Sequence, residues 1–242
     1  MATFGLVHGA WHGAWCWEAV VPALQARGHS AIAMDLPSDR RDATFGDYAA
    51  AVVDALSPSA DVVLVGHSLA GMVIPLVALQ RPVRVLVFLC ALIPERQGDP
   101  PGPGPPEHVE GTFDGLVHHA DGSHSWPSLE AATRILYQDC SRELAASAYA
   151  RLRRQQTALW DGLQPMARWP DVPLASIHCQ DDRAVNPAWS SWVGRHRLGL
   201  ESAELPGGHS PMLSRPALLA ETFAAIADRA WQPAGSEGAD RC

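Results

Sequence analysis

The most informative stretch of the sequence is DVVLVGHSLAGMVIPLVAL, residues 61–79. The aliphatic run 62–65 predicts a buried strand, and the apolar spacing over 69–80 predicts a helix. A sharp turn between them would project Ser68 above the edge of a sheet. Such a turn brings backbones close together and needs small residues two positions either side of the serine, where Gly66 and Ala70 stand. Ala70 departs from the glycine of the G-x-S-x-G pattern but is still small.

Similar apolar runs alternate with helical patterns along the rest of the chain. This alternation predicts an α/β fold with a doubly wound, mostly parallel sheet of about six strands, covered by helices on both faces. We expect strands at residues 3–7, 31–35, 62–65, 83–89, 174–178 and 202–205. We expect helices at residues 17–27, 45–56, 69–80, 189–196 and 216–231.

The alternation breaks between about residues 94 and 170. This stretch opens with the proline-rich segment GDPPGPGPP, 98–106, and continues with a predicted helical segment over about 128–160. In a fold whose ligands bind at the carboxyl ends of strands, such an insertion could form a helical lid, or a layer that only stabilises the sheet edge. We therefore predict a single domain over residues 1–231 and a frayed tail over 232–242.

Composition excludes several function classes. The net charge of −8 disfavours nucleic acid and anionic membranes as partners. The chain has no lysine, which excludes Schiff-base chemistry, a Ser-Lys dyad and a P-loop. Its five scattered cysteines form no C-x-x-C pair, and neither a signal peptide nor a membrane span is evident. These features favour a cytoplasmic protein without a cofactor; the oligomeric state stays open, a homodimer included.

A serine hydroxyl needs a histidine to take its proton and a carboxylate to orient that histidine. In this fold the three residues follow the chain order serine, acid, histidine. The turn after the strand at 174–178 contains Asp181 and Asp182, and the turn after the next strand contains His209. Both turns lie at the carboxyl ends of predicted strands, so we expect them beside Ser68.

The sequence resembles the α/β-hydrolase superfamily in three motifs, which occur in the same order. They are HGAWHGAW at 8–15, GHSLAG at 66–71, and Asp182 followed by GGH at 207–209. The first motif, followed by CWE, resembles the branch of plant methyl-ester esterases, hydroxynitrile lyases and bacterial pyrethroid-hydrolase-type esterases. In that branch the acid is the aspartate of a D-x-x-V/I pattern, which Asp182, followed by Arg183, Ala184 and Val185, fits best; Asp181 is the alternative.

The resemblance also implies an oxyanion hole formed by the backbone amides of Ala10 and Leu69. An apolar substrate pocket could be lined by Trp15, Trp126, Trp160 and Met212, although these residues would serve equally well in core packing. The set His118, His119 and His124 matches no standard zinc spacing, so we predict no metal site.

These features predict a serine hydrolase that cleaves a carboxylic ester or thioester of a small molecule through an acyl-enzyme. Hydroxynitrile lyase activity is disfavoured, because Ser210 replaces the lysine that this group carries and Gly9 replaces its hydroxyl residue. Dehalogenases and epoxide hydrolases carry a carboxylate where this chain has Ser68. Two alternatives remain: a biosynthetic thioesterase or cyclase acting on a polyketide-like intermediate, and a non-catalytic small-molecule receptor.

Overall fold

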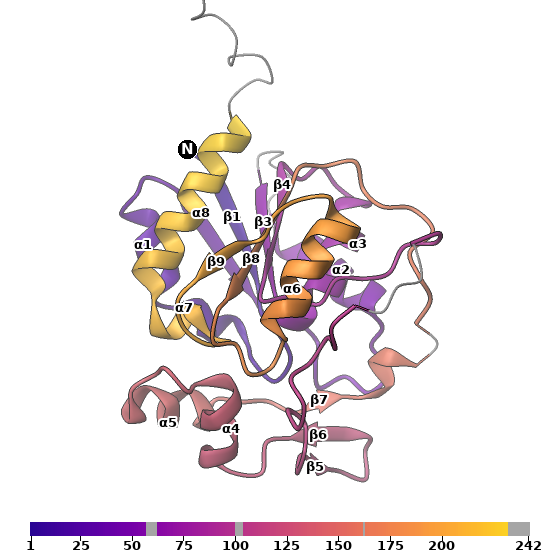
Figure 1. Cartoon of the computed structure of the whole chain (residues 1–242), viewed down its shortest axis with the longest axis vertical. Helices are drawn as coiled ribbons and strands as arrows, with labels where there is room; N and C mark the ends of the chain where they lie inside the picture. Colours follow the sequence, from indigo (N-terminus) through magenta and orange to yellow (C-terminus); the bar gives the residue numbers. More distant parts are fainter. Residues whose placement is uncertain (57–61, 100–103, 162, 232–242) are drawn as a thin grey trace, which may run out of the picture.

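A six-stranded parallel sheet forms the centre of the molecule (Figure 1). The structure is a computed structural model that describes residues 1–56, 62–99, 104–161 and 163–231. The strand order is β2-β1-β3-β4-β8-β9, and each neighbouring pair is parallel. The strands are β1 (Thr3–Val7), β2 (Ser30–Met34), β3 (Val62–His67), β4 (Val85–Leu89), β8 (Leu174–Cys179) and β9 (Ala203–Leu205). The predicted mostly parallel sheet of about six strands is confirmed.

Helices cover both faces of this sheet, which explains why β3 and β4 are buried along their whole length and are apolar apart from His67. One face packs against α1 (Val20–Gln25), α7 (Pro211–Ser214) and α8 (Pro216–Trp231). The other face packs against α2 (Phe45–Ala55), α3 (Ile74–Ala78) and α6 (Pro187–Val193).

Two predicted helices are shorter than expected and begin with tighter turns. The predicted helix at 69–80 is a 3₁₀ turn over Ser68–Met72 followed by α3, and the helix predicted at 17–27 is a 3₁₀ turn over Ala14–Trp17 followed by α1. In α3, Pro75 occupies the first turn, where a residue without an N–H is tolerated and the backbone angle suits a helix start.

We call the described residues of 94–170 the cap, and its helices and small sheet lie over the carboxyl ends of the strands (Figure 1). The cap contains α4 (Leu129–Leu136), α5 (Arg142–Ala150), and a small antiparallel sheet of β5 (Val117–His118), β6 (Ser123–Ser125) and β7 (Gln155–Gln156). The prediction of one helical segment over 128–160 was therefore wrong. Tyr137 leaves the helical conformation and the Ser141 hydroxyl caps a new helix, while strands of two or three residues are too short for a periodic signal.

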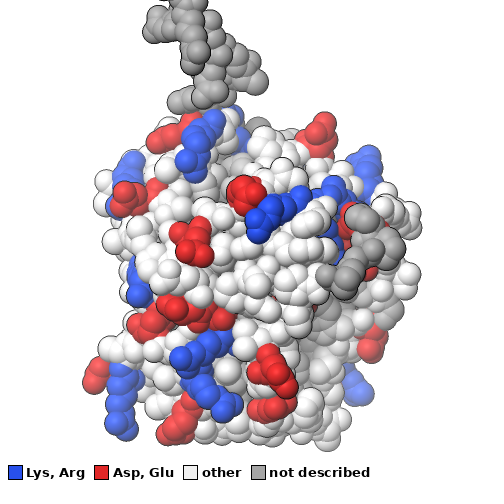
Figure 2. All heavy atoms as spheres, in the orientation of Figure 1, with Lys and Arg blue, Asp and Glu red and all other residues white. Residues whose placement is uncertain are grey.

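Two sequence predictions concern residues outside the described part of the chain. Positions 100–103 of the proline-rich segment and the whole tail at 232–242 belong to this group. Among the described residues, no helix has the length and apolar character needed to cross a membrane. Figure 2 shows arginine and acidic side chains interspersed over the visible face, without a large patch of one sign.

Candidate active site

Ser68 lies where β3 turns sharply into the following 3₁₀ turn. Its backbone φ is 53°, a left-handed conformation that is unusual for a residue with a side chain. A Cβ atom added to Gly66 would lie 2.8 Å from the carbonyl oxygen of Ala70, so only glycine fits at the base of this turn. The amide of Leu92 donates to the carbonyl oxygen of Ser68 at 3.0 Å. The turn is thus held in a strained conformation that exposes Ser68 to the pocket.

His209 and Asp182 form a buried pair on neighbouring turns. The Nδ1 atom of His209 lies 2.9 Å from Oδ2 and 3.1 Å from Oδ1 of Asp182. Because a carboxylate only accepts, Nδ1 carries the proton and Nε2 keeps its lone pair. Oδ1 also accepts from the amides of Ala184 at 2.8 Å and Val185 at 3.0 Å. These bonds hold the carboxylate in one orientation against the imidazole.

Asp181 occupies a different environment from its neighbour. It is exposed, and its amide donates to the carbonyl oxygen of Gly207 at 3.0 Å. This bond ties the turn of Asp181 and Asp182 to the turn that precedes His209. The geometry therefore brings Asp182, and not Asp181, to the histidine.

The turn after β1 approaches Ser68 closely. A Cβ atom added to Gly9 would lie 2.7 Å from the Cβ atom of Ser68. The Nδ1–H group of His8 donates to the carbonyl oxygen of Gly9, and that of His12 to the carbonyl oxygen of Ala10, each at 2.8 Å. The carbonyl of Gly9 and the amide of Ala10 belong to one planar trans peptide and point in opposite directions. His8 therefore controls the direction of the Ala10 N–H.

Burial keeps these supporting histidines uncharged. It lowers the pKa of His8 to about 4 and that of His12 to about 3. It also lowers the pKa of His67, and the nearby His209 and His12 add to this effect. A neutral imidazole has one N–H donor and one acceptor, and His12 uses both. Its Nε2 atom accepts from the hydroxyl of Tyr137 at 2.9 Å.

The residues that follow α4 connect the cap to the turn of His209. The side-chain amide of Gln138 donates to the carbonyl oxygen of Asp181 at 2.7 Å. The carboxylate of Asp139 accepts from the amide of Gly208 at 3.1 Å and from the guanidinium of Arg215. With the Tyr137 hydroxyl, which donates to His12, three consecutive cap residues support three turns: the turn after β1, the turn of Asp182 and the turn of His209.

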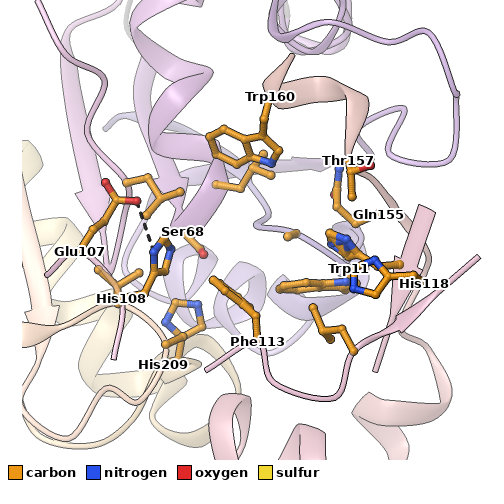
Figure 3. Close-up of a pocket in the computed structure, with 17 residues that line it drawn as sticks. Trp11, Ser68, Glu107, His108, Phe113, His118, Gln155, Thr157, Trp160 and His209 are labelled. Atoms are coloured by element: carbon orange, nitrogen blue, oxygen red, sulfur yellow. Dashed lines mark ion pairs between the residues drawn. The ribbon is translucent and has the colours of Figure 1, made fainter. Parts of the chain in front are cut away.

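A cavity of about 390 Å³ lies between the cap and the sheet, and Ser68 and His209 open into it (Figure 3). The residues Ala10 and Leu69 of the predicted oxyanion hole also line it. Most of its other walls are apolar, with polar side chains from the cap. These further lining residues are Trp11, Leu92, Glu107, His108, Phe113, Leu116, His118, His124, Gln155, Thr157, Trp160, Ala184 and Val185.

Of the four side chains predicted to line the pocket, the structure brings only Trp160 to its wall. Met212 is fully buried in the core beneath the sheet, against the layer of α8. Trp15 stacks on His12, and Trp126 packs against Trp11 inside the cap. The structure thus does not bring these three residues to the wall of this cavity, because an apolar side chain near the site in sequence can also be buried in the layer behind it.

The sequence did not identify Trp11, Glu107 and His108, which line the same cavity as Ser68. Trp11 has a left-handed φ of 63° in the turn after β1, which nothing in its motif signals. Glu107 and His108 follow the proline-rich segment and have no periodic pattern. A polar pair after prolines looks like an ordinary loop in the sequence, so only the fold could identify them.

His118, His119 and His124 of the cap are the histidines for which the sequence predicts no metal site. The rings of His118 and His124 lie 6.1 Å apart, and Nε2 of His119 lies 2.9 Å from the Ser125 hydroxyl. Within the ranges that the structure describes, no three His, Cys, Asp or Glu side chains are grouped to hold a metal ion.

The family model that describes the alpha/beta hydrolase family matches residues 6–222. The chain belongs to this family. The predicted resemblance and fold class are therefore confirmed, and so is the prediction of an enzyme of the hydrolase class.

Several proteins are similar to this alpha/beta hydrolase over nearly their whole length. Methylesterase 2 of Arabidopsis thaliana is 29% identical over 93% of this chain and 95% of its own. Norfluorocurarine synthase 1 of a Strychnos species is 25% identical over 93% of this chain and 95% of its own. The crystal structure of a pyrethroid hydrolase from Sphingobium faniae aligns with a TM-score of 0.80 and 26% identity, covering 94% of this chain and 97% of its own.

Proposed function

We propose that this protein hydrolyses a carboxylic ester or thioester of a small molecule through an acyl-enzyme on Ser68. The observation that carries the proposal is the buried pair of His209 and Asp182, with Ser68 and His209 facing the same cavity. Similarity to proteins named methylesterase and pyrethroid hydrolase supports an ester as the substrate. The cavity fits a small molecule and is mostly apolar, so the ester has an apolar acyl or alcohol part.

In the first half of the reaction, Ser68 Oγ attacks the carbonyl carbon while Nε2 of His209 takes its proton. Asp182 stabilises the imidazolium that results. The amides of Ala10 and Leu69 donate to the oxygen that becomes negative in the tetrahedral intermediate. His209 then returns the proton to the leaving alcohol or thiol, the bond to the carbonyl carbon breaks, and the acyl group stays on Ser68.

In the second half, His209 removes a proton from water, which attacks the acyl carbon. The tetrahedral intermediate collapses, the carboxylic acid leaves, and the proton returns to Ser68 Oγ. Each residue ends in its starting state, so no cofactor is consumed. The supply of water to the acyl-enzyme depends on access through the cap.

We further propose that the cap is a lid inserted into a single domain. Its side chains form one wall of the cavity, and Tyr137, Gln138 and Asp139 contact the turns beside Ser68. Movement of the cap would therefore change both access and the alignment of the site. We also propose a cytoplasmic location, which the scattered, odd number of cysteines favours, and a homodimer is compatible with it.

The proposal is tested by hydrolysis of short and long p-nitrophenyl esters by the wild type and Ser68→Ala, with fluorophosphonate labelling in parallel. We expect turnover and labelling in the wild type and neither in Ser68→Ala. Equal turnover by the purified Ser68→Ala protein would contradict the role of Ser68.

The same experiment distinguishes the two alternative functions. Labelling of Ser68 without turnover of simple esters would favour a biosynthetic thioesterase or cyclase, to which the similarity to a protein named norfluorocurarine synthase lends support. Tight binding of a small molecule without labelling or product would favour a receptor. A relative named salicylic acid-binding protein 2, from Nicotiana tabacum, is 28% identical over 93% of this chain.

A further inference from the structure

A second pair of acidic and imidazole side chains faces the cavity beside Ser68. Oε1 of Glu107 lies 3.5 Å from Nδ1 of His108, and both residues line the cavity. Figure 3 shows this pair on the same side of the cavity as Ser68 and His209. The mechanism proposed above uses neither residue.

The backbone holds this pair firmly against the turn of Asp182. Residues 107–109 run antiparallel to residues 184–186, with the amide of Val109 donating to Ala184 at 3.2 Å and the amide of Asn186 to Glu107 at 2.9 Å. The hydroxyl of Thr112 also donates to the carbonyl oxygen of Arg183 at 2.9 Å. These bonds hold Glu107 and His108 at a set distance from the catalytic pair.

The local environment decides which atoms of His108 are available. Burial, with a contribution from the nearby His209, lowers its pKa and favours the neutral ring. The His108 ring packs against Phe113 in an edge-to-face arrangement, with ring centroids 4.8 Å apart. We assign the proton to Nδ1, which lies nearer the Glu107 carboxyl group, and this leaves Nε2 as a hydrogen-bond acceptor. A half-buried acceptor in an apolar cavity favours a ligand that brings a donor.

We propose that Glu107 and His108 form a recognition pair for esters whose acyl chain carries a hydroxyl or amine N–H group close to the ester carbonyl. Nε2 of His108 accepts a hydrogen bond from this group, while Glu107 fixes the tautomer and the orientation of the ring. The inference rests on the proposed function, because it places the donor relative to an ester carbonyl at Ser68. It adds a substrate class and two specificity-determining residues to that function.

The polar groups on the cap side of the cavity provide the matched control. His118 lines the same cavity and lies across it from His108 in Figure 3. It is exposed, and it lies in β5 of the cap instead of beside the turn of Asp182. Replacing it removes an imidazole from the cavity without removing the acceptor near Ser68.

The test uses ethyl esters of 2-hydroxy- and 3-hydroxy-3-phenylpropanoic acid and their methyl ethers, which keep the oxygen but lack the donor. Dissociation constants are measured by calorimetry in Ser68→Ala, and kcat/KM in proteins that retain Ser68. We expect at least one hydroxy ester to be preferred over its ether by about tenfold or more, as for sites that bind a substrate hydroxyl. His108→Phe should bring this ratio close to one, Glu107→Leu should lower it, and His118→Phe should leave it unchanged.

The outcomes separate this inference from the proposed function. A ratio near one in the wild type and in Ser68→Ala, or a ratio that survives His108→Phe, overturns the recognition pair even if esters are hydrolysed. The binding measurement could instead show a preference for the hydroxy ester that depends on His108, while no turnover depends on Ser68. That outcome supports the recognition pair and contradicts hydrolysis. Thermal unfolding of each variant shows whether a lost preference comes from misfolding. If His108→Phe does not fold, His108→Asn takes its place.

Discussion

The Nε2–H group of His67 donates to the backbone carbonyl oxygen of His209 at 2.8 Å. Because His67 directly precedes Ser68, the turn that presents the serine also holds the backbone of the histidine. The two imidazole rings lie 4.7 Å apart, and both are buried. This hydrogen bond between side chain and backbone thus couples the placement of Ser68 to that of His209.

Replacement of His67 should therefore lower catalysis more than substrate binding. We expect His67→Leu to lower kcat by about tenfold to a hundredfold, because small displacements of reacting groups have effects of this size. KM should change much less. The measurement is steady-state hydrolysis of a p-nitrophenyl ester, with His196→Leu as a control on the exposed surface. A rise in KM at constant kcat would show that His67 supports the pocket instead.

Asp182 and Asp181 provide an internal comparison of adjacent carboxylates. Asp182→Asn should lower kcat by about 10³- to 10⁴-fold, because an amide no longer holds the required tautomer of His209. Asp181→Asn should stay within a few fold of the wild type, since the backbone of Asp181 makes its contact with the turn of His209. The two variants are compared with the same ester at saturating concentration. The reverse order of activities would assign the orienting role to Asp181.

The hydroxyl of Tyr137 links the cap to the turn that carries Ala10. Tyr137→Phe leaves Nε2 of His12 without its donor and should lower the free energy of unfolding by about 1 kcal/mol. It should also lower kcat, because His12 holds the peptide next to the Ala10 amide. Chemical denaturation and ester hydrolysis measure the two effects. Tyr149→Phe, in α5, is the matched control; equal effects in both variants would argue against this link.

Stability should decrease in mild acid because buried histidines must gain a proton on unfolding. The pKa of His8 is lowered to about 4 and that of His12 to about 3 in the folded protein, so the unfolded chain binds more protons between these values and about 6.5. The stability that the folded protein has with neutral His8 and His12 is fully present above about pH 6.5 and is lost as the pH falls toward the folded pKa values. Each histidine lowers the unfolding free energy by up to about 1.4 kcal/mol per pH unit.

Urea denaturation between about pH 7.5 and pH 4.5 measures this loss. A midpoint that stays constant over this range would show that the two histidines are already protonated in the folded protein, or are exposed. The variant His12→Phe, if it folds, should show a weaker dependence of the unfolding free energy on pH. His8→Asn provides a second test of the same effect.

Gly71 permits the close approach of the turn after Ser68 to the end of β4. A Cβ atom on Gly71 would overlap the carbonyl oxygen of Leu92, which belongs to the backbone and cannot rotate away. Gly71→Ala should therefore destabilise the protein by about 1–3 kcal/mol and reduce activity, because Leu92 also binds the carbonyl oxygen of Ser68. Gly46→Ala, in the first turn of α2, should have little effect on either. Thermal unfolding and ester hydrolysis compare the variants.

Much of the core could be predicted from the sequence, because its signals are local. The run Val62–Val65 is apolar throughout and is a strand buried on both faces, and the predicted strand at 3–7 has the observed bounds. Ser68 and His209 stand in turns that directly follow predicted strands. In a parallel sheet the carboxyl ends of strands lie along one edge, so chain order was enough to bring these turns together.

The remaining features depend on contacts between distant segments, which have no local pattern. Asp182 and Asp181 have the same side chain, and only the fold buries Asp182 beside His209 and exposes Asp181. Met212 is apolar wherever it lies, and only packing showed it in the core instead of the pocket. Glu107 and His108 acquire their place beside Ser68 from antiparallel backbone bonds to residues 184–186, about 75 positions later in the chain. Local sequence thus specifies strands and turns, whereas the identity of the residues around a substrate comes from long-range packing.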